Sequence, residues 1–115
     1  MALTKIQIQE IEKAAAKFMY YQRPPLEIRE KLDIGYRIEG QSVYVFEIRP
    51  RWDKPEKKIE SPIAKTTFVK AKNHWKIFWM RANLKWYHYK PVPYVKKIEQ
   101  FFDLVGEDEL GCFWG

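Results

Sequence analysis

The spacing of apolar residues changes along this chain of 115 residues, from a helical repeat to a strand repeat at about residue 33. Before that point Ile8, Ile11, Ala15 and Phe18 recur every three or four positions, as on one face of a helix. From there on, apolar and polar residues alternate, as in strands with one buried side. A chain of this length forms one domain, so the helical and strand segments are expected to share a core.

The pattern predicts two helices, a set of strands and a last helix, at about 4–21, 25–32, 33–90 and 94–105. Thr4 and Gln7 have the spacing of a capping box, Pro25 suits the first turn of a short helix, and Gly106 is a helix stop. We therefore expect an α+β fold. Its antiparallel sheet would be a meander of about five strands, with the N-terminal and C-terminal helices packed on one face.

The net charge of +6 is unevenly distributed. Residues 51–97 carry 13 basic and 3 acidic side chains, whereas residues 98–115 carry 5 acidic and no basic ones. A basic block of this kind is typical of a surface that meets a polyanion. An acidic end folded back over the basic block would neutralise part of this charge.

Aromatic and cationic residues are interleaved within the basic block, a combination that holds single-stranded nucleic acid. Cations contact the phosphates while flat rings stack on the bases. The candidate binding residues are Arg49, Trp52, Lys70, Lys72, Lys76, Trp79, Arg81, Lys85 and Trp86. The alternative is structural, because one sheet face needs large rings for the core and the other needs lysines for solubility.

A second candidate is a polar cluster of Arg37, Glu47 and His88, with Arg49 on the same strand as Glu47. A carboxylate between two guanidinium groups is able to bind an anionic ligand or to order a catalytic acid. Ordinary cross-strand ion pairs are the alternative, and they contribute about 0.2–1 kcal/mol each. No motif predicts a catalytic residue, so an enzyme is the less favoured interpretation.

Signals for metal, cofactor and membrane binding are weak. No metal-ligand spacing and no glycine-rich phosphate loop occurs in the sequence. Cys112 is the only cysteine, which excludes an intrachain disulfide and favours the cytoplasm. No apolar run approaches the roughly 18 residues of a membrane span, and the N-terminus lacks the pattern of a signal peptide. We therefore expect no metal, no cofactor and no membrane contact.

The chain ends on two aromatic residues, Phe113 and Trp114. Gly111 allows the backbone to turn sharply, so we expect the segment 107–115 to dock on the domain and remove both rings from water. The alternative is an exposed aromatic handle for a protein partner.

Four segments carry a resemblance to a known family: YRIEGQSVYVFEIRPRW, SPIAK, the hairpin W-x-I-F-W-M-R-A-N-x-K-W-Y-H-Y, and D-E-L-G-C-F-W-G. They are similar to small bacterial proteins grouped as domain-of-unknown-function family 3024. The resemblance covers roughly Arg23 to Gly115. It implies a single domain with ordered ends, and it implies no catalytic residue.

Together these features predict a small cytoplasmic domain whose basic, aromatic sheet binds an anionic partner, such as single-stranded or structured nucleic acid. A non-enzymatic protein-interaction module that uses the sheet or the C-terminal end is the alternative. An unrecognised enzyme centred on Arg37, Glu47, Arg49 and His88 is the third interpretation.

Overall fold

The computed structural model describes residues 3–114 and has an α+β fold, as the sequence predicts. A helix lies near each end of the chain, and the strands lie between them. In chain order the elements are α1 (Lys5–Gln22), β1 (Asp33–Glu39), β2 (Ser42–Pro50), β3 (Lys58–Val69), the 3₁₀ helix η1 (Lys70–Lys72), β4 (His74–Met80), β5 (Trp86–His88), β6 (Tyr94–Val95) and α2 (Ile98–Glu107).

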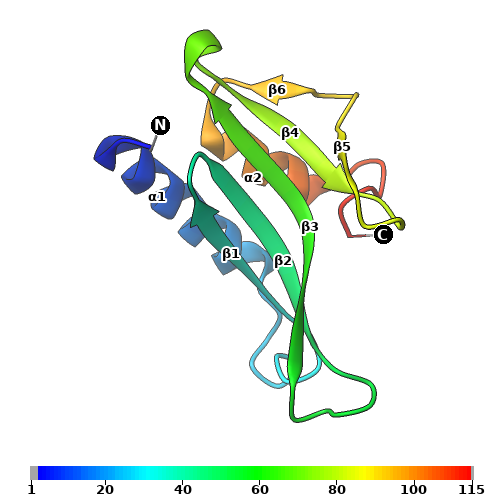
Figure 1. Ribbon diagram of the computed structural model, residues 1–115. Coiled ribbons are helices and arrows are strands. Elements are labelled where there is room, and N and C mark those ends of the chain that lie inside the picture. The colour runs from blue at the N-terminus through cyan, green and yellow to red at the C-terminus, as the bar shows by residue number, and fades with distance from the viewer. Residues whose placement is uncertain (1–2, 115) are drawn as a thin grey trace.

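The sheet is an antiparallel meander in the order β1-β2-β3-β4-β5 (Figure 1). Gly40 and Gln41 form the two-residue turn between β1 and β2, and Gly40 has the positive φ of 58° that such turns favour. The short strand β6 pairs with β4 beside β5, where the sequence predicted the start of the last helix. Because Tyr94 and Val95 extend the sheet, α2 begins only at Ile98.

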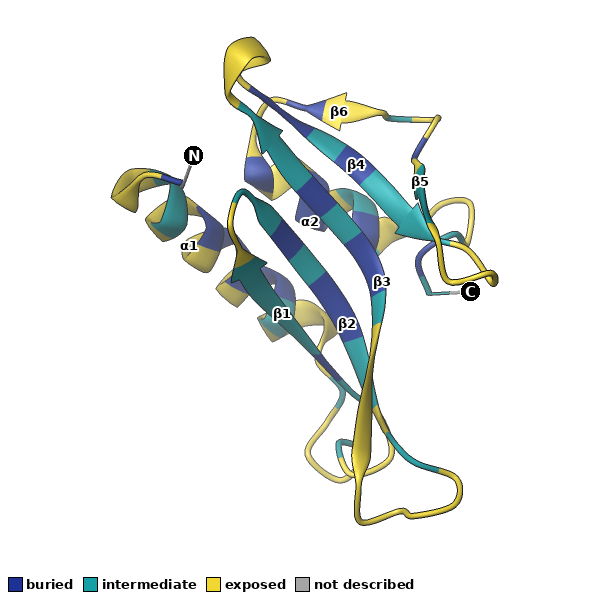
Figure 2. Cartoon of the chain, in the orientation of Figure 1, coloured by how far each residue is buried: buried dark blue, intermediate teal, exposed yellow. Residues whose placement is uncertain are grey.

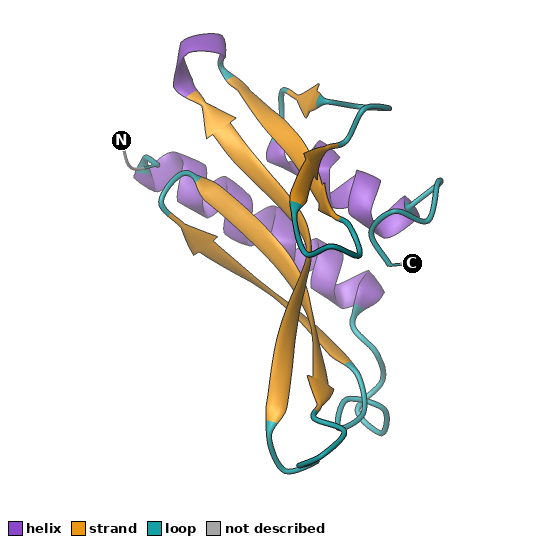
Figure 3. Cartoon of the chain, turned by 45° about the vertical axis from the view of Figure 1, so that its right-hand side comes forward, coloured by secondary structure: helices purple, strands orange, loops and turns teal. Residues whose placement is uncertain are grey.

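Both helices cover the same face of the sheet, and the opposite face carries no helix (Figures 1 and 3). α1 lies next to β1, and α2 lies next to β4 and β6. The core fills the space between the layers with alternate strand residues and the inner sides of the helices (Figure 2). Its most deeply buried apolar members are Ile11, Ala15, Val43, Val45, Ala64, Ile77, Phe101 and Val105. No helix within residues 3–114 is long and apolar enough to span a membrane.

The first helix begins at the predicted capping box. The Gln7 N–H donates to the Thr4 hydroxyl oxygen at 3.1 Å, and the Thr4 N–H donates to Oε1 of Gln7 at 2.8 Å. The two side chains therefore satisfy two N–H groups, one of them in the first turn of the helix, that have no backbone partner.

The short helix expected at 25–32 does not form. The segment makes a run of turns, in which the Ile28 N–H donates to the Pro25 carbonyl at 2.9 Å. The Arg29 side chain donates to the Pro24 carbonyl at 2.8 Å, and Ile28 remains exposed. A segment this short needs a packed apolar face to hold a helix, and this one buries too little apolar surface.

Gly106 does not end the last helix, contrary to the sequence prediction. α2 continues to Glu107, and Asp108 adopts the left-handed conformation that ends it, with φ of 41°. Gly106 faces α1 instead: a Cβ atom there would lie 3.0 Å from Nε2 of Gln22 and 3.8 Å from the Phe18 ring. The missing side chain therefore allows the two helices to approach closely.

The last described residues fold back onto the end of α2, and we call residues 108–114 the C-terminal latch. The Asp108 carboxylate accepts hydrogen bonds from the N–H groups of Phe113 at 3.0 Å and Trp114 at 2.9 Å. The Trp114 indole N–H donates to the Val105 carbonyl at 2.7 Å. Phe113 is buried, with its ring 4.9 Å from that of Tyr89. The Phe113 ring is thus unavailable as a handle, and Gly115 lies outside the described residues.

Arg23 and Asp33 join the end of α1 to the start of β1. Nε and Nη2 of Arg23 each donate to one carboxylate oxygen of Asp33 at 2.9 Å. This pairing with Arg23 holds the pKa of the Asp33 carboxyl below its usual value. The carboxylate therefore stabilises the fold above the unfolded pKa of about 3.9, and this stabilisation is lost as pH falls through the lower folded value.

We expect Asp33→Asn to flatten the acid side of the stability profile. The variant cannot release a proton at this position, so its free energy of unfolding should rise less with pH between about 2 and 5. Urea denaturation at a series of pH values measures this slope. Identical slopes for the variant and the parent chain would show that the Arg23–Asp33 pair does not contribute to folding.

Candidate functional site

A row of side chains crosses the sheet face that no helix covers. The strand register places Arg37 opposite Tyr44, Tyr44 opposite Lys65, Lys65 opposite Phe78, and Phe78 opposite His88. Directly opposed residues lie on the same side of a sheet, so these five form one row with a member from each of β1 to β5. With neighbouring strands about 4.8 Å apart, the row is about 19 Å long.

Lys65 lies at the middle of the row, with its ammonium group among three aromatic rings. Nζ is 5.1 Å from the centroid of Phe78, 5.7 Å from that of Tyr44 and 5.8 Å from that of Trp86. These distances are within the reach of cation–π attraction. No ion pair within residues 3–114 involves Lys65. The rings therefore orient this charge and leave it without a neutralising carboxylate.

The Arg37 end of the row is closer to charge balance. The guanidinium lies 4.8 Å from the centroid of the Phe46 ring. It also pairs with Glu60 at 3.1 Å and with Glu39 at 3.6 Å. Arg37 is therefore held in place by one ring and two carboxylates, whereas Lys65 is held by rings alone.

Lys76 and Tyr94 form a second pair of a cation and a ring on this face, where β6 runs beside β4. The Tyr94 ring is 55% exposed and stacks on the His74 imidazole, with centroids 4.5 Å apart and planes 17° apart. His74 itself is buried, so Tyr94 presents a supported, flat ring to the solvent. We call the whole surface the aromatic-basic face; it consists of Arg37, Tyr44, Lys65, Lys76, Phe78, Trp86, His88 and Tyr94.

The predicted nucleic-acid-binding residues do not share one face of the sheet. Lys76 and Trp86 lie on the aromatic-basic face, as the row and its neighbours show. Trp79 lies on the helix side, opposite Ala64, and packs against the core. Arg81 has its guanidinium 5.5 Å from the centroid of Trp79, so it also belongs to the helix side. The interpretation of Trp79 as a core residue is therefore the better one.

The other five predicted residues lie at strand ends or in connections. Lys70 and Lys72 lie in η1, and Lys85 lies in the turn between β4 and β5. Arg49 lies near the end of β2, and Trp52, which is 93% exposed, lies in the loop that follows. Because the 12 residues of β3 separate that loop from η1, the two groups are roughly 35 Å apart.

The predicted polar cluster of Arg37, Glu47 and His88 is not assembled. Arg37 and His88 lie at opposite ends of the row, about 19 Å apart. Glu47 lies opposite Ile34, on the helix side, where it pairs with Arg49 at 3.0 Å. Ordinary ion pairs therefore account for these charges. Within residues 3–114 no group of histidine, cysteine and acidic side chains is arranged to hold a metal ion.

Sequence reasoning missed Tyr44, Lys65 and Phe78, which form the centre of the row. Strand alternation does put Phe78 on the same side as Lys76, but it gives no register between strands. The register is what places Lys65 between Tyr44 and Phe78. Two-residue turns at both ends of β3 would have fixed its register with β2 and β4. Within residues 3–114, the only turn between strands that is this short is the one between β1 and β2, so the register of β3 could not be predicted.

The surface thus offers fixed cations beside flat rings. Such a surface is able to bind a ligand that carries both negative charges and planar groups. The acidic residues of α2 are on the other side of the sheet, among them Glu99 and Asp103, which line a groove between the helices. They do not cover the aromatic-basic face.

Comparison with known proteins gives one match. The family model described as Domain of unknown function (DUF3024) matches residues 3–115, which include all the strands of the aromatic-basic face and the C-terminal latch. No curated protein and no solved structure matches the chain. A family model that matches this much of the sequence assigns it: the chain belongs to the DUF3024 family of domains of unknown function.

Proposed function

We propose that this domain binds single-stranded nucleic acid on the aromatic-basic face. One observation carries the proposal: the Lys65 ammonium lies among the rings of Tyr44, Phe78 and Trp86 on a sheet face without a helix. A lysine there contacts a phosphate while the neighbouring rings stack on bases. Sheet faces that carry aromatic side chains are an established means of stacking the bases of RNA.

The charge distribution supports the same partner. Lys72 and Lys85 lie in the connections before and after β4, at the two ends of the strand that carries Lys76 and Phe78. They extend the positive potential beyond the face itself. Positive charges attract a polyanion over a distance of about one Debye length, so these lysines would raise the rate at which the domain and the nucleic acid meet.

The proposal is tested by fluorescence anisotropy with a labelled 12-nucleotide oligothymidine at several salt concentrations. We expect binding that weakens steeply as salt rises, and quenching of tryptophan fluorescence by stacking. The double variant Lys65→Gln/Lys76→Gln should lower the slope of log K against log salt by about 1.4, which is about 0.7 for each lost phosphate contact.

A matched control removes the same charge from the helix side. Lys13→Gln/Lys17→Gln changes two exposed lysines of α1 and should leave the salt slope close to that of the parent chain. Thermal melting verifies that both double variants are folded. Equal loss of binding in the two double variants would mean that only the net charge matters, and an absence of binding at low salt would refute the proposal.

A further inference from the structure

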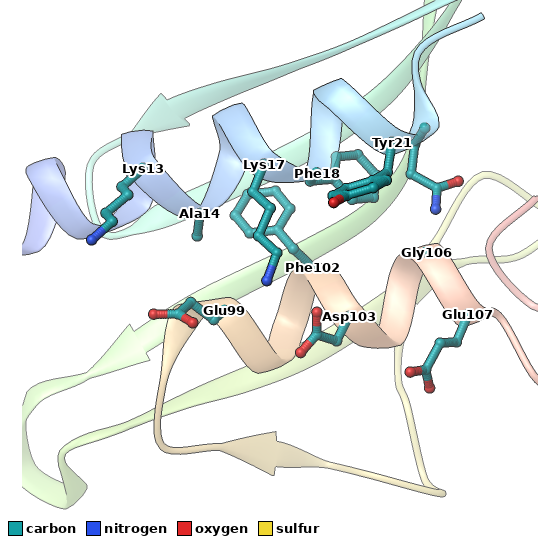
Figure 4. Close-up of a pocket in the computed structure, with 11 residues that line it drawn as sticks. Lys13, Ala14, Lys17, Phe18, Tyr21, Glu99, Phe102, Asp103, Gly106 and Glu107 are labelled. Atoms are coloured by element: carbon teal, nitrogen blue, oxygen red, sulfur yellow. The ribbon is translucent and has the colours of Figure 1, made fainter.

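A groove runs between α1 and α2 on the side of the helix layer that faces away from the sheet (Figure 4). Its volume is about 440 Å³, which is within the usual range of ligand sites. Ala14, Phe18, Phe102 and Gly106 line its floor, and Tyr21, which is 70% exposed, stands at one end. The groove is distinct from the aromatic-basic face and is not used by the proposed function.

The two walls of the groove carry opposite charges (Figure 4). α1 contributes the cations and α2 the anions: Lys13 and Lys17, and Glu99, Asp103 and Glu107. On each wall successive charges are four residues apart, so they recur about once per helical turn. No ion pair within residues 3–114 joins one wall to the other, so both sets of charges remain able to meet a partner.

We propose that the groove binds an amphipathic α-helix of a partner protein. The apolar ridge of this helix would contact the exposed ring of Tyr21 and lie over the buried rings of Phe18 and Phe102 in the floor. Its acidic residues would lie along the edge next to α1 and its basic residues along the edge next to α2. The repeat of charges every four residues along both walls favours a helix over a small zwitterion as the ligand. A small zwitterion uses one cation and one anion, whereas a helix presents charges at i and i+4 that match every turn of both walls.

The opposite signs of the walls also fix the direction of the partner helix. Reversing a helix in the groove exchanges its two edges and places acidic residues beside Glu99 and Asp103. Like charges across an interface are unfavourable, so one direction is selected. A helix with the same charge on both edges is repelled by the wall of like charge, whichever direction it takes.

The experiment uses three designed 16-residue helical peptides that share one leucine ridge. Their edges are glutamate and lysine, glutamate on both sides, or lysine on both sides. We expect the mixed peptide to bind about tenfold more tightly than either of the others, measured by calorimetry with the full chain. Equal affinities, or no binding of the mixed peptide, would overturn the proposal. Displacement of the mixed peptide by a free glutamyl-lysine dipeptide would assign the groove to small zwitterions instead.

Charge-exchange variants locate the binding site. Lys17→Glu makes that part of both walls acidic and should weaken the mixed peptide about tenfold, whereas Lys76→Glu makes the same charge change on the aromatic-basic face and should have no effect. Exchanging all five wall charges restores walls of opposite sign and should recover affinity with the peptide reversed; this variant is Lys13→Glu/Lys17→Glu/Glu99→Lys/Asp103→Lys/Glu107→Lys. A spin label at the peptide N-terminus reports that reversal by broadening resonances at the other end of the groove. Failure of this folded exchange variant to recover binding would refute the charge match.

Discussion

Replacement of Phe113 by alanine should lower the free energy of unfolding by about 3–5 kcal/mol, the usual loss when a buried phenylalanine is truncated. Phe113 is only 3% exposed although it lies two residues from the end of the sequence, and its ring contacts that of Tyr89. The alanine variant would leave a cavity beside Tyr89 and release a segment held by the Asp108 carboxylate. For a domain of this size the melting temperature should fall by about 10–20 °C, measured by circular dichroism.

Trp52→Ala is the matched control, because it also truncates an aromatic residue. Trp52 is 93% exposed and lies in the loop after β2, so its removal should change stability by less than about 0.5 kcal/mol. If Phe113→Ala and Trp52→Ala melted at the same temperature, the C-terminal latch would not be docked in solution.

Local signals predict the parts of this fold that depend on neighbours in sequence. The spacing of Thr4 and Gln7 predicts the start of α1, and Gly40 predicts the two-residue turn after β1. Alternation of apolar residues predicts the strands because one face of the sheet is covered by helices and the other is not. The α+β class follows from the order of these elements.

Tertiary contacts override the local signals at the end of α2. Gly106 has the sequence character of a helix stop, yet it lies inside α2 because α1 approaches it through Gln22. Asp108 takes the stop position, where its carboxylate also caps the N–H groups of the latch. No local sequence pattern marks Asp108 for these two roles, because the residues that donate to its carboxylate lie five and six positions further along the chain.

The candidate site could be predicted only in part, because it depends on register across five strands. Trp86 and Lys76 were predicted as binding residues and lie on the aromatic-basic face. Lys65 was missed because β3 has one extra residue, Ile63, between Pro62, which pairs with Phe46, and Ala64, which pairs with Val45. A bulge of this kind changes which residues lie opposite each other, and its local sign is a proline inside the strand, Pro62.

A methyl group added at Gly35, on the same side of the sheet as Arg37, should destabilise the domain. The Phe46 ring lies across Gly35, so an added Cβ would be 2.8 Å from its Cε2 atom and 2.9 Å from Cζ. A ring opposite a strand glycine covers backbone that would otherwise be bare, and here the same ring also supports the Arg37 guanidinium. We expect Gly35→Ala to lower the free energy of unfolding by about 1–3 kcal/mol, as overpacking does, measured by urea denaturation.

A second substitution separates this contact from any other cost of the alanine. Phe46→Leu removes the two ring atoms that the new Cβ would meet, while it keeps an apolar side chain at that position. The double variant Gly35→Ala/Phe46→Leu should therefore be more stable than the sum of the two single losses, by at least about 1 kcal/mol. Strictly additive losses would mean that Phe46 does not lie on Gly35 in solution.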